Sequence, residues 1–146
     1  MIDYHRLVIL LRTRASVRTW QKIDDADRSE AWPSRRMIYA VEPTDETTLF
    51  VFAHECGHVA LNHPDLSVQG KAARHEYDAT QWAFSALRRL GVRVSPDIVR
   101  FAKECLAGYV ETDLECGHVP LRIRFFVRGV KPAYAERHEN RKDAGE

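Results

Sequence analysis

The chain has 146 residues, of which 45% are hydrophobic and 29% are charged, and its formal net charge is +1. This size suits one domain with a single core, and the near-neutral charge gives no electrostatic basis for binding nucleic acid or an anionic membrane. No apolar run approaches the length of a membrane-spanning helix, so we expect no membrane partner. The three cysteines form no C-x-x-C pair, which favours a reducing compartment over a disulfide framework.

The first third of the chain predicts a helix and two strands. Residues 4–14 hold a short apolar run between basic residues, and we favour a helix there over a buried strand. Residues 17–23 lean toward a strand because they are rich in β-branched and aromatic side chains. The polar segment 24–34 predicts a loop, and residues 36–41 predict a strand that could accept a peptide as an added strand.

The next segment, His54-Glu55-Cys56-Gly57-His58, has the pattern H-E-x-x-H. It lies in an apolar stretch without proline, which predicts a helix over residues 48–62, with Thr44, Asp45 and Thr47 as candidate N-caps. Glycine costs a helix about 1 kcal/mol relative to alanine, so Gly57 predicts a second helix crossing close by.

Two histidines four positions apart lie on the same face of a helix, so His54 and His58 can bind one zinc ion. Glu55 follows the first histidine and is placed to act as the general base, which takes a proton from water and returns it to a leaving amine. The simpler interpretation is a helix with two surface histidines. The apolar flanks argue against it, because uncompensated polar groups are costly in a core helix.

The rest of the chain predicts further helices. Residues 62–65 end the motif helix, 66–69 form a loop, and a long helix covers 70–90 with Gly91 as its stop. Ser95 and Pro96 open another helix, which we expect to end near Tyr109. Residues 113–119 give no clear pattern, 121–127 predict a strand, and 131–146 predict a mobile tail beyond a single domain at 1–130.

A catalytic zinc usually has three protein ligands, so a third is needed. Glu76 is our leading candidate, since it lies 76 − 58 = 18 residues after His58 on the next predicted helix. His75 and Asp78 are the alternatives. Asp78 also suits a supporting role, in which it accepts an N–H from a ligand histidine, and His75 could instead hydrogen-bond the oxyanion.

The segment from 36 to 90 resembles the ImmA/IrrE group of small zinc metallopeptidases, which pair H-E-x-G-H with a downstream E-x-x-A-[N/D]-x-F-A. Here the second motif begins at Glu76, with Thr80 at the Asn/Asp position and Trp82 in place of Phe. The resemblance implies an α+β, mainly helical, zincin-like domain with a small antiparallel or mixed sheet beside the motif helix. It also implies a cytoplasmic peptidase that binds Zn²⁺ through His54, His58 and Glu76.

Two functional hypotheses follow. The first is a zinc endopeptidase that cleaves a specific protein, for example a co-encoded transcriptional repressor, with Glu55 as general base. Its oxyanion donor would come from a set of four candidates, namely His75, Tyr77, Tyr109 and His118. The alternative is a non-catalytic metal-binding module, such as an inhibitor or adaptor of a mobile element. That module would add a fourth metal ligand from Cys56, Cys116 or His118.

Overall fold

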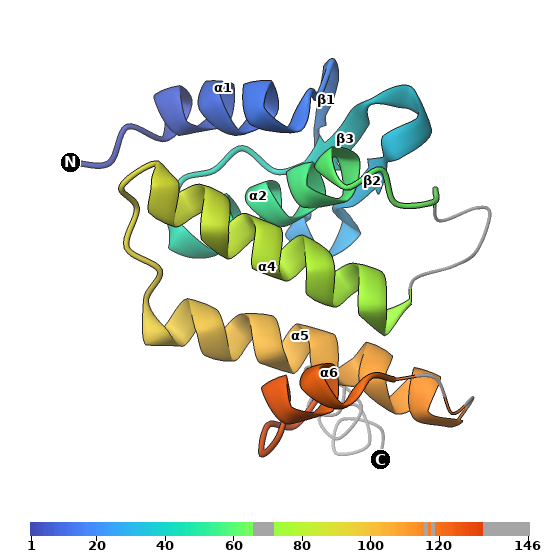
Figure 1. The fold of residues 1–146 in the computed structure, drawn as a ribbon. Coiled ribbons are helices and arrows are strands. Elements are labelled where there is room, and N and C mark those ends of the chain that lie inside the picture. The colour runs from blue at the N-terminus through green and yellow to red at the C-terminus, as the bar shows by residue number, and fades with distance from the viewer. Residues whose placement is uncertain (66–71, 116, 118, 133–146) are drawn as a thin grey trace, which may run out of the picture.

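The computed structural model describes residues 1–65, 72–115, 117 and 119–132 (Figure 1). The fold is α+β and mainly helical with one small mixed sheet, which confirms the predicted class at that level. In chain order, the helices and strands are α1 (Tyr4–Ala15), β1 (Thr19–Lys22), the 3-10 helix η1 (Ala26–Arg28), β2 (Glu30–Trp32), the 3-10 helix η2 (Pro33–Arg35), β3 (Met37–Ala40), α2 (Glu46–Ala60), α4 (Ala73–Arg89), α5 (Pro96–Glu115) and α6 (Leu121–Phe126).

The strands lie in the order β1-β3-β2, with β3 parallel to β1 and antiparallel to β2. The strands predicted at 17–23 and 36–41 are therefore present as β1 and β3. Our prediction that a peptide adds to the strand at 36–41 is wrong, because β3 is central and is hydrogen-bonded on both sides. Strand β2 is an outer strand that packs against α2, and among the described residues no strand pairs with its other edge.

The loop predicted at 24–34 is wrong in part, since η1, β2 and most of η2 lie there. Strand β2 pairs Ala31 with Ile38 and Trp32 with Met37. A strand of three residues is too short to show alternation in the sequence, and it depends on a partner strand further along the chain.

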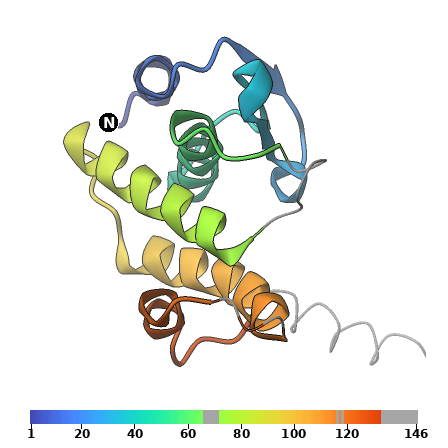
Figure 2. The same cartoon turned by 45° about the vertical axis from the view of Figure 1, so that its right-hand side comes forward.

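Helix α2 occupies the centre of the fold, between α1 and the sheet on one side and α4 on the other (Figures 1 and 2). It begins with a capping box, in which the Asp45 carboxylate accepts from the Thr48 N–H at 2.8 Å and the Thr48 hydroxyl accepts from the Asp45 N–H at 3.1 Å. The backbone hydrogen bond from Thr48 lowers the pKa of Asp45. The central position confirms that the motif helix belongs to the core, and Phe52, Cys56 and Val59 are fully buried on it.

Gly57 is the point of closest approach between α2 and α4. A Cβ atom built on Gly57 would lie 2.9 Å from the carbonyl oxygen of Ala79 and 3.3 Å from Cε3 of Trp82. The predicted reason for this glycine is therefore correct: a second helix crosses where a side chain would stand. The same crossing sets α4, and with it Glu76, against the histidine-bearing face of α2.

Helices α4 and α5 lie side by side in both views and agree with the predicted helices, although α5 is longer than expected (Figure 2). Helix α4 ends before Gly91, whose φ of 78° lies in the left-handed region that favours glycine. Helix α5 begins at Pro96 as predicted, with the Ser95 hydroxyl accepting from the Ile98 N–H at 3.3 Å. It continues past the expected end near Tyr109 to Glu115, and so covers the first three residues of the segment 113–119, which shows no clear pattern in the sequence.

The strand predicted at 121–127 is wrong, because residues 121–126 form helix α6. The apparent alternation does not mark one face: Leu121 and Phe125 are each 65% exposed, whereas Ile123 is fully buried. Ile123 and Val127, four positions apart, pack with residues of α5 in a second apolar cluster, which is the spacing of a helix.

Three other expectations concern the chain as a whole. The predicted loop at 66–69 and nearly all of the predicted tail, residues 133–146, lie outside the described residues. The single domain at 1–130 stays a prediction. In the part of the chain that the structure describes, no helix is both long enough and apolar enough to span a membrane.

We predict that Gly57→Ala destabilises the protein, although alanine favours an isolated helix by about 1 kcal/mol. The added Cβ meets the backbone of Ala79, which cannot rotate away, so the two helices must separate at a cost of about 1–3 kcal/mol. Thermal unfolding measures the loss. The control is Ser85→Ala, exposed on α4, which should change stability by less than about 0.5 kcal/mol. A Gly57→Ala protein as stable as the control would contradict the close contact.

Candidate metal centre

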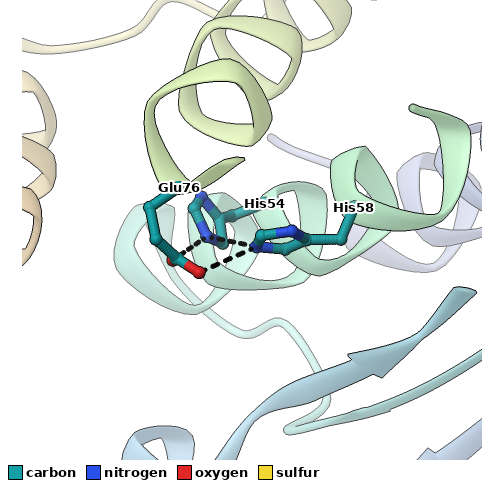
Figure 3. Close-up of side chains that lie close together, drawn as sticks. All are labelled: His54, His58 and Glu76. Atoms are coloured by element: carbon teal, nitrogen blue, oxygen red, sulfur yellow. Dashed lines mark hydrogen bonds and ion pairs between the residues drawn. The ribbon is translucent and has the colours of Figure 1, made fainter. Parts of the chain in front are cut away.

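Three side chains from α2 and α4 converge on one point (Figure 3). The Nε2 atoms of His54 and His58 are 3.1 Å apart, Nε2 of His54 is 3.1 Å from Oε2 of Glu76, and Nε2 of His58 is 3.5 Å from Oε1 of Glu76. Among the residues that the structure describes, this is the cluster of three or more His, Cys, Asp or Glu whose ligand atoms fit within 4.8 Å. The structure thus brings together the two motif histidines and the leading candidate for the third ligand.

The geometry fits a tetrahedral metal ion. Ligand atoms about 2.0–2.1 Å from a tetrahedral zinc lie about 3.3 Å from one another. The Nε2–Nε2 separation of 3.1 Å is close to that value, and so are the distances of 3.1 and 3.5 Å from the two rings to the two different oxygens of the Glu76 carboxylate. Two imidazoles and a carboxylate are also a donor set that zinc takes in hydrolytic sites.

Charge at the site also fits a cation. The Glu76 side chain is only 7% exposed, against 15% for His54 and 11% for His58. Burial raises the pKa of Glu76, but hydrogen bonds to His54 and His58 outweigh burial and hold its pKa below the ordinary range. A buried carboxylate that stays ionised needs positive charge beside it, and a metal ion supplies that charge when both imidazoles are neutral.

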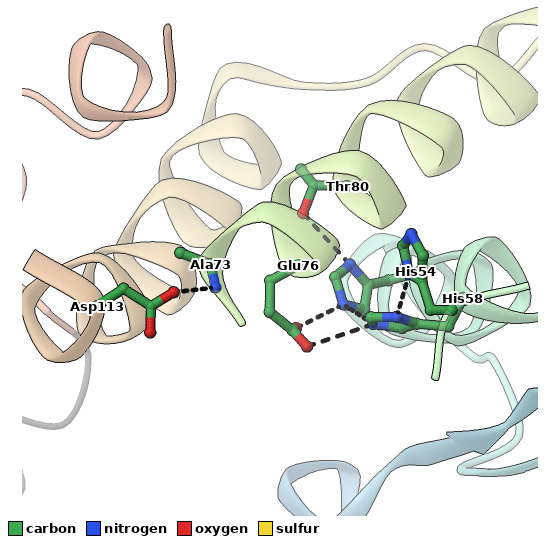
Figure 4. Close-up of polar contacts among 7 residues, drawn as sticks. His54, His58, Ala73, Glu76, Thr80 and Asp113 are labelled. Atoms are coloured by element: carbon green, nitrogen blue, oxygen red, sulfur yellow. Dashed lines mark hydrogen bonds and ion pairs between the residues drawn. The ribbon is translucent and has the colours of Figure 1, made fainter. Parts of the chain in front are cut away.

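Thr80 orients the His54 ring by contacting Nδ1, the ring nitrogen that does not face the other two donors. Nδ1 of His54 lies 3.3 Å from the Thr80 hydroxyl oxygen, which comes from one turn further along α4 than Glu76 (Figure 4). When Nε2 binds a metal, Nδ1 carries the proton and donates it to this oxygen. Thr80 therefore provides a polar partner for His54 from the same helix that carries Glu76.

His63, which lies just beyond the end of α2, orients the His58 ring by contacting its Nδ1 atom. The two Nδ1 atoms are 2.8 Å apart, and the His63 ring stacks on His75 with centroids 4.6 Å apart. Burial and the electrostatic influence of the neighbouring histidine His58 lower the pKa of His63 to about 4. His63 is therefore neutral near pH 7, and its Nδ1 can accept the proton that His58 donates.

The start of α4 is held by a residue that the sequence did not indicate. Ala72 precedes the helix and provides no side-chain cap. Asp113 of α5 takes that role, since its carboxylate accepts from the Ala73 N–H at 2.7 Å (Figure 4). This contact fixes the first turn of α4 and so the position of Glu76. No local pattern could reveal it, because the two residues are 113 − 73 = 40 positions apart.

Glu55 lines a cavity of about 570 Å³ together with His54 and Glu76. It is 6% exposed, so this carboxylate is buried in the cavity lining next to His54 in the chain. A carboxylate in this position can exchange a proton with a molecule in the cavity without serving as a metal ligand.

The other candidate residues separate into groups. Tyr109 lines the same cavity as Glu55. Tyr77 packs edge-on against Phe126, with centroids 5.4 Å apart, and is not among the residues that line the cavity. Asp78 and His75 line a different hollow of about 910 Å³. The Nδ1 atoms of His54 and His58 contact Thr80 and His63, which take the supporting role expected of Asp78. His118 lies outside the described residues.

Comparisons of the chain with protein-family models, curated proteins and solved structures give no match. The site therefore rests on its own geometry, and the likeness to ImmA/IrrE peptidases stays an interpretation of the sequence.

We predict that zinc stabilises the protein and that Glu76→Gln removes most of this effect. A ligand present at about 100 times its Kd adds about 2.7 kcal/mol to the free energy of unfolding. The amide keeps the shape of the carboxylate but lacks its charge. Thermal unfolding with and without added ZnCl₂ measures the difference, with Glu104→Gln on α5 as the matched control. If zinc raises the melting temperature of Glu76→Gln as much as that of the control, Glu76 is excluded as a ligand.

We also predict that Thr80→Val weakens zinc binding by about 10–100-fold, because His54 loses its hydrogen-bond partner without a change in side-chain volume. Thr80→Ser keeps the hydroxyl and should restore most of the affinity. Competition with a chromogenic chelator measures both values. If Thr80→Val binds zinc like the wild type, then the Thr80 hydroxyl does not orient His54.

Proposed function

We propose that this protein is a zinc-dependent endopeptidase that hydrolyses a peptide bond in a specific protein substrate. The observation that carries the proposal is a second buried carboxylate, Glu55, which lines a cavity with His54 and Glu76, two of the three donors that also include His58. Zinc held by those donors would supply Lewis-acid polarisation of the scissile carbonyl and lower the pKa of water.

Glu55 does the proton chemistry in this proposal. Its carboxylate takes a proton from the attacking water and later delivers it to the nitrogen of the leaving amine. Burial helps, since a carboxylate shielded from bulk water interacts more strongly with charge that develops nearby. Tyr109 is the candidate from our oxyanion set that shares the cavity, so its hydroxyl is the donor to test first.

The substrate backbone would lie along β2. Strand β2 packs against α2, and Ser29, just before this strand, lines the cavity with Glu55. A peptide added to the outer edge of β2 would run past the cavity with its backbone held by hydrogen bonds. This replaces β3, the strand that the sequence suggested, as the docking strand.

The number of donors favours catalysis over a structural metal site. A structural zinc usually has four protein ligands, whereas three described residues converge here. Cys56, a candidate for the fourth ligand, is fully buried in the core cluster and belongs neither to the three converging side chains nor to the cavity lining. Burial raises the pKa of the Cys56 thiol.

The resemblance of residues 36–90 to ImmA/IrrE peptidases supports a cytoplasmic setting and a protein substrate. A transcriptional repressor encoded beside this chain is therefore the first substrate to test.

We predict that Glu55→Gln lowers the rate of proteolysis by at least about 100-fold while the bound zinc remains. The amide fills the same space but cannot accept a proton. The assay is cleavage of the co-encoded repressor or of proteins from the native context, followed by gel electrophoresis and mass spectrometry, with zinc content measured by atomic absorption. Glu104→Gln on α5 is the matched control and should cleave like the wild type.

Two results would count against the proposal. In the first, a wild-type protein with one zinc bound cleaves no protein from its native context. In the second, Glu55→Gln and wild type cleave at the same rate.

A further inference from the structure

Ser29 carries a hydroxyl without a hydrogen-bond partner in the described structure. The residue is 7% exposed, and it lines the cavity that contains Glu55, His54 and Glu76. Buried polar groups are nearly always hydrogen-bonded, and one that is not costs stability. An unpartnered hydroxyl at the wall of a cavity therefore indicates a group that a ligand satisfies.

The wall formed by α5 is mostly apolar, with the hydroxyl groups of Tyr109 and Thr112 toward the C-terminal part of the helix. Phe101, Ala102, Cys105 and Leu106 line the cavity from this helix, and none carries a charge. On α2, Phe50 extends the wall: its ring centroid lies 6.0 Å from that of His54 and 6.2 Å from that of Phe101. An apolar wall with a few polar groups at one end is the usual form of a pocket for an organic ligand, and 570 Å³ lies within the usual volume of about 300–1,000 Å³.

Ser29 also stands where a peptide backbone would pass. It immediately precedes β2, the outer strand beside α2, and it lines the same cavity as residues of α5. Both Ser29 and α5 are outside residues 36–90, the segment that resembles the ImmA/IrrE group. Ser29 and the α5 wall, which with Phe50 would select a substrate, thus belong to parts of this chain that the resemblance does not cover.

We propose that this cavity selects peptides with a large apolar side chain next to the scissile bond. The side chain packs against Phe50, Phe101 and Leu106, and the Ser29 hydroxyl hydrogen-bonds the peptide backbone beside it. This inference rests on the proposed peptidase function, because it specifies which peptides such an enzyme would take.

The test uses two neutral probes, N-acetyl-leucinamide and N-acetylglycinamide, titrated into the full-length protein with zinc bound and followed by NMR. We expect the leucine probe to bind at least about fivefold more tightly and to shift the signals of residues 101–109 of α5. We expect Ser29→Ala to weaken binding of the leucine probe by about fivefold, the usual value of one hydrogen bond.

Thermal unfolding separates a binding role of Ser29 from a structural one. Because its hydroxyl is buried without a partner, Ser29→Ala should melt at the wild-type temperature or above it. The matched control, Ser85→Ala, lies at the other hollow and should leave probe binding unchanged. A lower melting temperature for Ser29→Ala, or unchanged probe binding, overturns the role of Ser29.

The titration also distinguishes this inference from the proposed function. Equal binding of the two probes, or shifts confined to residues far from α5, overturns the apolar pocket even if the protein cleaves its substrate. Selective binding of the leucine probe at α5 supports the pocket even if Glu55→Gln and wild type prove equally inactive, which would instead count against the peptidase.

Discussion

The close crossing of α2 and α4 at Gly57 is the constraint on which the candidate site depends. The two histidines are fixed by α2 and Glu76 by α4. The distance between these helices therefore sets the separations within the donor triangle, the group formed by the metal-facing atoms of His54, His58 and Glu76. A side chain at position 57 would meet the backbone of Ala79, three residues after Glu76. Absence of a Cβ atom at one position thus permits donor separations close to the value of about 3.3 Å for a tetrahedral ion.

Contacts around the triangle reduce the freedom of its members. Thr80 and His63 occupy the Nδ1 atoms of the two rings, which leaves each Nε2 directed at the common point. Asp113 holds the first turn of α4, in which Glu76 lies. Side chains that are already ordered lose little conformational entropy when a ligand binds, so the arrangement favours tight and specific metal binding.

Sequence reasoning succeeded where the relevant geometry is local. The spacing of His54 and His58 fixes their relation on any helix, and Glu76 needed only the further assumption that consecutive helices pack side by side. It failed where a contact joins distant segments, as with Asp113 and the first turn of α4, or depends on burial, as with Ser29. The same limit explains the errors in secondary structure. Strand β2 forms only by pairing with β3, which lies further along the chain. The short run that forms α6 is compatible with the periodicity of a strand and with that of a helix, and only the burial of Ile123 and Val127 distinguishes them.

The parts of the cavity have different origins in the chain. Its floor, formed by His54, Glu55 and Glu76, comes from the segment with the H-E-x-x-H motif and the helix that follows it, whereas Ser29 and the α5 wall come from segments before and after it. The floor would determine which bond can be broken, since the proton transfer and the metal both belong to it. The walls would determine which peptide reaches that floor, because an apolar surface favours apolar side chains without taking part in the reaction. Changes in α5 could therefore alter the substrate of such an enzyme while the donor triangle stays the same.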